Sequence, residues 1–196
     1  MTAILGFNCT DGLLFLADTE ETIGATKSEC EKLQRLTLPC GVVVLGGAGD
    51  SDWIDYATFR APQRLLQKPF SGWANIHEEV NEFAKRITKE MVGAYKGFDP
   101  LSVPTIEMLI GVQPFKNGVQ MYRWRSNIAT PITGPSVSVG CGITQMNPML
   151  SDLQDAKYNP YSVSGSCEAM LFHGVRIMRQ TKRTVQSCGK RTEALA

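Results

Sequence analysis

The chain has 196 residues, of which 43% are hydrophobic, and its 20 lysines and arginines against 19 aspartates and glutamates give a formal charge of +1. This length suffices for one compact domain with its own core, so we expect a single domain over residues 1–196. A charge this close to zero offers no basic field for a phosphate backbone, and nucleic acid is therefore not an expected partner.

The six cysteines form no CxxC pair, and only His77 and His173 could complete a metal site with them. We therefore expect reduced thiols, no metal and no cofactor. Disulfides would require an export signal, which residues 1–20 lack. Because the apolar stretches are also short and interrupted by charges, the sequence predicts a soluble, cytoplasmic chain that does not bind membranes.

The N-terminal part of the chain predicts two β-hairpins. Residues 3–9 are apolar and strand-like, residues 10–12 supply turn chemistry, and residues 13–17 form a second apolar run. Further on, residues 32–36 alternate apolar with polar side chains, and a β-branched run follows at residues 42–45.

Helical periodicity begins after the glycine cluster at residues 46–49, first from Trp53 onward toward Leu65. A second helix is predicted by one apolar face, formed by Ile76, Val80, Phe83, Ile87 and Met91. Strand signals return at residues 106–112, 119–124 and 137–139, and a last amphipathic helix carries Met170 to Met178 and ends near Lys182. Strands, a helix pair, more strands and more helices indicate an α+β fold.

Taken one at a time, the polar and glycine residues near the N-terminus have ordinary explanations. Thr2 is compatible with simple removal of Met1, Asp18 ends a strand, and Lys32 precedes one. The turn Gly46-Gly47-Ala48-Gly49 could serve only as a strand-to-helix connection.

Their order, however, resembles the proteasome β-subunit and HslV family of N-terminal nucleophile (Ntn) hydrolases, and in particular a bacterial homologue. The matching stretches are Thr2 to Leu5, Leu16 to Gly24, Lys32 to Leu36 and Gly46 to Asp50. Weaker matches follow at Val139-Gly140-Cys141-Gly142 and at Ser187-Cys188-Gly189. The resemblance implies a four-layer αββα sandwich, with two antiparallel sheets between helical layers.

The resemblance implies a threonine endopeptidase whose nucleophile is Thr2 after removal of Met1. The free α-amine would act as base, Lys32 would tune it, and Asp18 would hold the lysine charged. Gly46, with Gly47 as the second choice, would donate a backbone N–H to the oxyanion. The full catalytic set implied is Thr2, Asp18, Lys32, Gly46, Cys141 and Ser187.

For partners, the resemblance implies a peptide or unfolded-protein substrate, a homo-oligomeric ring and, as an option, an ATPase regulator. Backbone pairing would hold an extended peptide at Thr22, Gly46 and Ala48. The substrate-binding residues implied are Glu21, Thr22, Cys30, Gly47 and Ala48. Because the family continues past the segment matching Gly189 into closing strands, we expect those strands to be missing here or the chain to be truncated.

Two other hypotheses stay open. Glu20 stands where the family has an arginine. Cys141 and Thr184 stand where the family has a serine and an acidic residue, and these two departures favour a catalytically silent ring subunit. An Ntn amidohydrolase acting on a small amide is the third, because fold does not fix substrate. Both enzymatic hypotheses require a free Thr2 amine, whereas the silent-subunit hypothesis predicts that Met1 stays attached.

Overall fold

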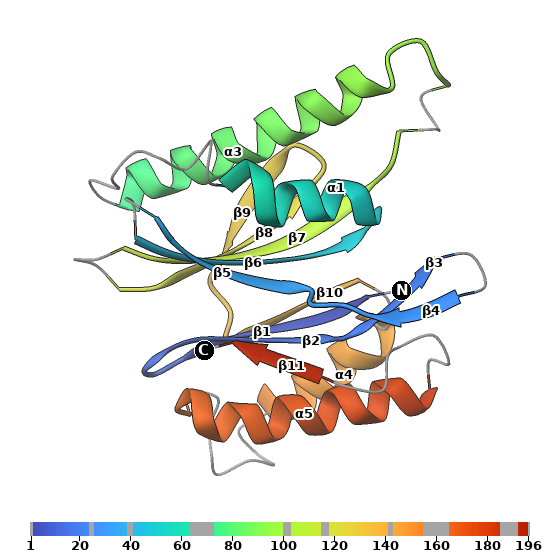
Figure 1. Ribbon diagram of the computed structural model, residues 1–196. Helices are drawn as coiled ribbons and strands as arrows, with labels where there is room; N and C mark the ends of the chain where they lie inside the picture. Colours follow the sequence, from blue (N-terminus) through green and yellow to red (C-terminus); the bar gives the residue numbers. More distant parts are fainter. Residues whose placement is uncertain are drawn as a thin grey trace.

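The computed structural model describes residues 2–23, 26–38, 41–62, 73–99, 103–114, 118–140, 143–154, 165–184 and 192–195. Their strands form two main antiparallel sheets and a separate two-stranded ribbon (Figure 1). The α+β class and the two antiparallel sheets predicted from the sequence are confirmed.

The smaller main sheet has the strand order β10-β1-β2-β11. It consists of β10 (Ser136–Gly140), β1 (Ala3–Cys9), β2 (Gly12–Asp18) and β11 (Thr192–Leu195). β1 and β2 form the predicted N-terminal hairpin, in which Ile4 lies opposite Ala17 and Cys9 opposite Gly12. Both strands are almost continuously buried, as expected for a sheet covered on both faces.

The larger sheet has the order β5-β6-β7-β8-β9. Its strands are β5 (Leu33–Leu38), β6 (Gly41–Gly49), β7 (Ile106–Gln113), β8 (Gln120–Arg125) and β9 (Ile128–Ile132). The ribbon of β3 (Glu20–Ile23) and β4 (Thr26–Glu29) projects from the end of the sheets at which β2 stops (Figure 1).

Helices cover the outer face of each sheet (Figure 1). α1 (Ser51–Asp55), its π-helical continuation η1 (Tyr56–Arg60) and α3 (Trp73–Ala94) lie on the larger sheet. α4 (Ile143–Gln154) and α5 (Cys167–Thr184) lie on the smaller sheet. Among the described helices, none is both long and apolar enough to cross a membrane.

Three apolar clusters join these layers. One lies between the helices α1 and α3 and the larger sheet, and it contains the whole predicted stripe from Ile76 to Met91. The second lies between β1, β2 and the helices α4 and α5. The third joins the facing sides of the two sheets through residues such as Ile4, Phe15 and Leu109. Burial of apolar surface therefore fixes the relative positions of the two sheets.

The predicted helix beginning near Trp53 is present as α1 and η1, and its expected end near Leu65 lies outside the described residues. α1 begins where Asp50 accepts a hydrogen bond from the backbone N–H of Trp53 at 3.2 Å, an ordinary N-cap. The sequence analysis did not predict β9, α4 or β11. β11 pairs with β2.

Candidate functional site

Asp18 and Lys32 form a buried ion pair at the end of β2. Lys32 Nζ lies 3.2 Å from Asp18 Oδ2, and the side chains are 7% and 0% exposed. Lys32 Nζ also donates a hydrogen bond to the carbonyl oxygen of Glu20, the first residue of β3. These two acceptors compensate the ammonium for its lost hydration, which a buried charge requires.

The same carboxylate also holds the start of β1. Asp18 Oδ1 accepts a hydrogen bond from the backbone N–H of Ala3 at 2.7 Å. The β1–β2 register explains this contact, because Ile4 lies opposite Ala17 and the next pair outward is Ala3 with Asp18. Asp18 therefore connects the residue that follows Thr2 to the ammonium of Lys32.

Gly140 fixes the backbone of Thr2 from the other side of β1. It lies opposite Ala3 in the β1–β10 pairing and has a φ of 90°. A Cβ placed on Gly140 would lie 2.0 Å from the carbonyl oxygen of Thr2 and 2.8 Å from Cβ of Ala48. Only glycine permits both this backbone conformation and this close approach.

A cavity of about 850 Å³ opens beside these residues. Thr2, Lys32 and Cys30 line it together with the backbone segment Gly47 to Gly49 at the end of β6. Helices α1, η1 and α3 contribute the apolar part of the wall through Ile54, Phe59, Met91 and Val92. Thr2 is partly exposed and lines this cavity, which is large enough for several residues of an extended peptide.

The residues of the glycine turn, Gly46 to Gly49, differ in whether they line the cavity. Gly46 pairs with Leu33 on β5 and with Leu109 on β7, and it does not belong to the cavity lining. β5 begins at Leu33, so among the described strands Gly47, Ala48 and Gly49 pair with β7 alone. This leaves a short strand edge of β6 at the cavity.

Of the remaining predicted site residues, only Cys30 has a side chain within the described part of the chain. Cys30 lines the cavity, and its backbone N–H donates to the carbonyl of Thr19 at 2.8 Å. Glu21 and Thr22 belong to β3 and pair with Ser28 and Lys27, but their side chains lie outside the described part of the chain. Cys141 and Ser187 also lie outside the described residues.

Glu107 contributes a charged group to the cavity wall that the sequence analysis did not predict. It lines the cavity and binds both Arg123 and Arg125 on the neighbouring strand β8. The β7–β8 register places Glu107 directly opposite Arg125. Strand alternation alone could not have revealed this group, because the pairing depends on the register of two strands.

Gly140 was also missed as a site residue, although the sequence analysis quoted the surrounding motif Val139-Gly140-Cys141-Gly142. The available signal was a glycine immediately after a buried strand, where a positive φ or a close backbone approach is common.

The chain is similar to solved structures of Anbu (ancestral beta-subunit) proteins. The protein from Yersinia bercovieri matches with a TM-score of 0.79 and 16% identity over 98% of this chain and 80% of that one. The Anbu (Gly-1) mutant from Hyphomicrobium sp. strain MC1 matches with a TM-score of 0.78 and 16% identity over 99% of this chain and 80% of that one. The protein from Pseudomonas aeruginosa is described as a helical assembly of the Anbu complex. It matches with a TM-score of 0.73 and 15% identity over 98% of this chain and 80% of that one. No protein-family model and no curated protein matches the chain.

The assignment to the proteasome β-subunit and HslV family was wrong. The similar structures are Anbu proteins, which are proteasome-like but form a distinct family. The resemblance rested on a few short stretches around Thr2, Asp18, Lys32 and a glycine turn, and residue patterns this short can occur in more than one family with the same fold. Such features do not separate the families built on that fold. At 16% identity, the structural likeness shows the fold of this chain.

Proposed function

We propose that this chain is a threonine-type peptidase whose nucleophile is the hydroxyl group of Thr2 after removal of Met1. We also propose that residues 1–196 form one domain and that its layers are the four-layer αββα sandwich of the Ntn hydrolases. The observation that carries the proposal is the position of Asp18, which binds both Lys32 and the backbone next to Thr2 beside an accessible cavity.

The proposed reaction is acyl transfer without a histidine. The free α-amine of Thr2 has an ordinary pKa of roughly 8 and takes the hydroxyl proton, directly or through one water. The Thr2 oxygen attacks the peptide carbonyl carbon, the amine group of the substrate leaves with a proton, and water then hydrolyses the ester. A positive charge on Lys32 favours the neutral form of the amine and stabilises the developing negative charge.

The strand edge at Gly47 to Gly49 supports an extended peptide as substrate. A peptide that pairs with this edge would occupy the space β5 leaves open, with β3 and Thr22 as the other expected boundary. Gly47 lies on the cavity wall, which favours its N–H group as the oxyanion donor, and Gly46 remains the alternative.

We further propose that the chain assembles with copies of itself into a ring or a helical array. The similar protein from Pseudomonas aeruginosa is described as a helical assembly. We expect such an assembly to restrict the access of other proteins to the cavity. The alternative of a silent structural subunit predicts the same assembly without hydrolysis, and the experiment below separates the two.

The test is hydrolysis of a panel of fluorogenic peptides by the assembled wild-type chain, Thr2→Ala and Thr130→Ala. Thr130 lies exposed on β9, so its variant is the matched control for loss of a threonine hydroxyl. We expect cleavage by the wild type and by Thr130→Ala and none by Thr2→Ala. Equal rates for the wild type and Thr2→Ala on every peptide would contradict the proposal and favour a silent subunit.

A further inference from the structure

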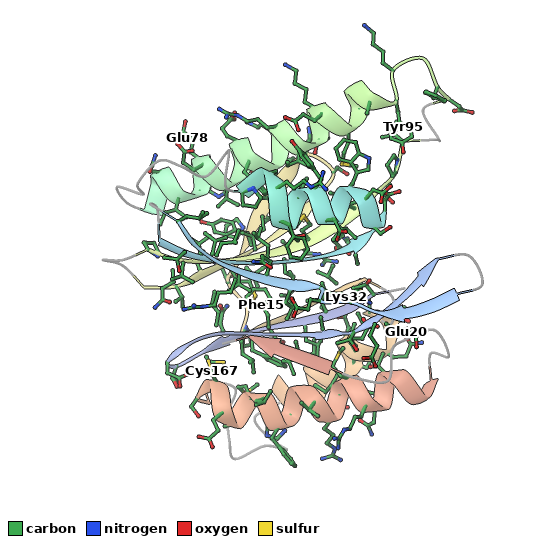
Figure 2. All side chains as sticks on the ribbon, viewed as in Figure 1. Phe15, Glu20, Lys32, Glu78, Tyr95 and Cys167 are labelled. Carbon is green, nitrogen blue, oxygen red and sulfur yellow. The ribbon has the colours of Figure 1, made fainter. Side chains whose placement is uncertain are left out.

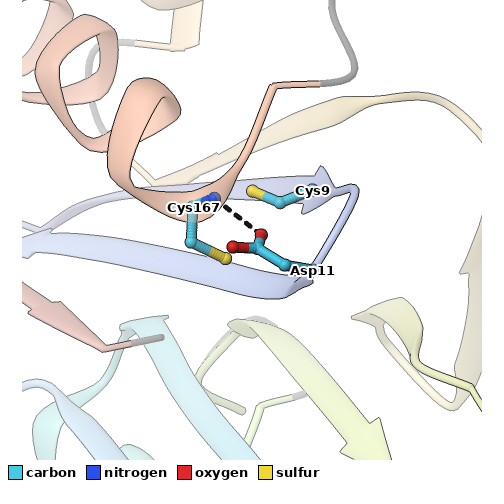
Figure 3. A group of neighbouring side chains, drawn as sticks. All are labelled: Cys9, Asp11 and Cys167. Atoms are coloured by element: carbon cyan, nitrogen blue, oxygen red, sulfur yellow. Dashed lines mark hydrogen bonds between the residues drawn. The ribbon is translucent and has the colours of Figure 1, made fainter.

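Two cysteines and an aspartate meet at the end of the smaller sheet remote from Thr2. Cys9 ends β1, Asp11 lies in the turn between β1 and β2, and Cys167 is the first residue of α5. Their sulfur and carboxylate atoms all lie within 4.8 Å of one another (Figure 3). Cys9 and Cys167 carry no disulfide.

Two hydrogen bonds join the turn between β1 and β2 to the start of α5. Asp11 Oδ1 accepts a hydrogen bond from the backbone N–H of Cys167 at 2.7 Å (Figure 3). The N–H of Thr10 donates to the carbonyl of Gly165 at 3.2 Å. The hairpin turn and the start of α5 are therefore fixed relative to each other before any ligand binds, which lowers the entropy cost of binding one.

The cluster is also accessible and separate from the candidate active site. Cys9 and Cys167 are partly exposed and Asp11 is exposed. Cys9 lies seven positions after Thr2 along β1, which corresponds to roughly 23 Å of extended strand. Figure 2 shows Cys167 at the opposite end of the sheets from Lys32 and Glu20.

We propose that Cys9, Asp11 and Cys167 bind one thiophilic divalent cation of the zinc class, with water completing the coordination. Zinc binds thiolate sulfur at about 2.3 Å and carboxylate oxygen at about 2.0–2.2 Å in a tetrahedron, so its ligand atoms lie roughly 3.5–3.8 Å apart. Ligand atoms within 4.8 Å reach that spacing by side-chain rotation or shifts of about 1 Å. Two sulfur ligands select zinc over magnesium or calcium.

The hydrogen bond from the Cys167 N–H orients the carboxylate of Asp11 as outer partners orient the ligands of other metal sites. The bound ion would cross-link the β1–β2 hairpin to α5. Its role is therefore structural, and it takes no part in the proposed chemistry at Thr2.

Disulfide formation is the competing use of two adjacent cysteines. Burial raises the pKa of the Cys9 thiol. Burial, followed by hydrogen bonds with Cys9 and Asp11, raises the pKa of Cys167 to about 12. Both cysteines are nevertheless free thiols in the structure, which leaves both sulfur atoms available to a metal ion.

The experiment is titration of the full chain, metal-free and reduced, with cobalt(II) as a spectroscopic substitute for zinc. We expect thiolate-to-cobalt charge-transfer absorption that saturates at one ion per chain and disappears when zinc is added. Zinc should also raise the melting temperature of the wild type, because a ligand that binds only the folded state stabilises it.

The variants are Cys9→Ser, Cys167→Ser and Asp11→Asn, with Cys30→Ser as the control for loss of a partly buried cysteine. We expect both ligand-cysteine variants to lose the absorption, Asp11→Asn to weaken binding on the order of tenfold to a hundredfold, and the control to bind as the wild type does. Because Asp11 is exposed in a turn, its variant keeps the test valid if a cysteine variant does not fold.

Three results would overturn the proposal. The first is no charge-transfer absorption from the reduced wild type. The second is unchanged absorption in folded Cys9→Ser and Cys167→Ser. The third is a Cys9–Cys167 disulfide in the freshly purified chain, without metal uptake after its reduction.

Discussion

One carboxylate, that of Asp18, joins Lys32 to the first strand. Its Oδ2 lies 3.2 Å from Lys32 Nζ, and its Oδ1 accepts the N–H of Ala3 at 2.7 Å. Because Ala3 directly follows Thr2, we expect a change in this ion pair to act on both the charge near Thr2 and the position of the Thr2 backbone. The choice of substitution separates the effect of the charge near Thr2 from the effect of the Thr2 backbone position.

Lys32→Ala removes the ammonium and should abolish most peptide hydrolysis while the fold persists. Loss of a charge-coupled catalytic group commonly lowers the rate on the order of a thousandfold, or about 4 kcal/mol of transition-state stabilisation. The measurement is kcat/KM on the best fluorogenic peptide, with intact assemblies checked by light scattering. Activity above about a tenth of wild type, an effect below roughly 1.4 kcal/mol, would exclude Lys32 as the tuning group.

Asp18→Asn should reduce both stability and activity. The substitution leaves a buried ammonium without its counter-charge, and breaking a buried pair in this way commonly costs about 3–5 kcal/mol. Urea unfolding gives the free energy of unfolding. Glu78→Gln is the control, because Glu78 is exposed on α3 and its loss of charge should change stability by less than about 0.5 kcal/mol. Equal free energies of unfolding for the two variants would show that the charge of Asp18 does not stabilise the fold.

Gly140→Ala should lower activity by displacing Thr2. The new Cβ would meet the Thr2 carbonyl oxygen at 2.0 Å, so the backbone of Thr2 must shift. Gly97→Ala is the control, since Gly97 has a similar φ of 95° and nothing within 4 Å of its Cβ position. Both variants share the cost of a positive φ, and peptide hydrolysis should fall only in Gly140→Ala. Equal losses of activity in both variants would remove the positioning role of Gly140.

The N-terminal hairpin and the helix α3 could be predicted because their patterns are local. Apolar runs separated by turn residues indicated β1 and β2, and five apolar residues at helical spacing indicated α3. α4 was not predicted, because Pro148 lies inside it and a proline usually ends a helix. Long-range partners such as β11 with β2 leave no local pattern at all.

The same limit applies to the sites. The order of Thr2, Asp18 and Lys32 along the chain suggested one site, and the structure brings Asp18 and Lys32 together and places Thr2 on the same cavity as Lys32. The proximity of Cys9 to Cys167 could not be predicted, since the absence of a CxxC motif argued against any metal site. Ligands contributed by a hairpin and a distant helix converge only after folding.

The assembly prediction concerns the state of the chain in solution. The apolar stripe of α3 packs within the chain. Exposed apolar side chains lie instead at Phe172 on α5 and Val92 on α3, which are 71% and 53% exposed. We expect a homo-oligomer in light scattering at micromolar concentration. A monomer under those conditions would contradict the proposed ring or helical array.

The central claim, that Thr2 is an N-terminal nucleophile, is tested most directly by the intact mass of the active assembly after reaction with an electrophilic peptide. We predict that Met1 is absent, that each chain gains one peptide adduct, and that peptide mapping places the adduct on Thr2. Thr2→Ala should gain none. Retention of Met1 in fully active protein, or an adduct that persists in Thr2→Ala, would contradict the claim.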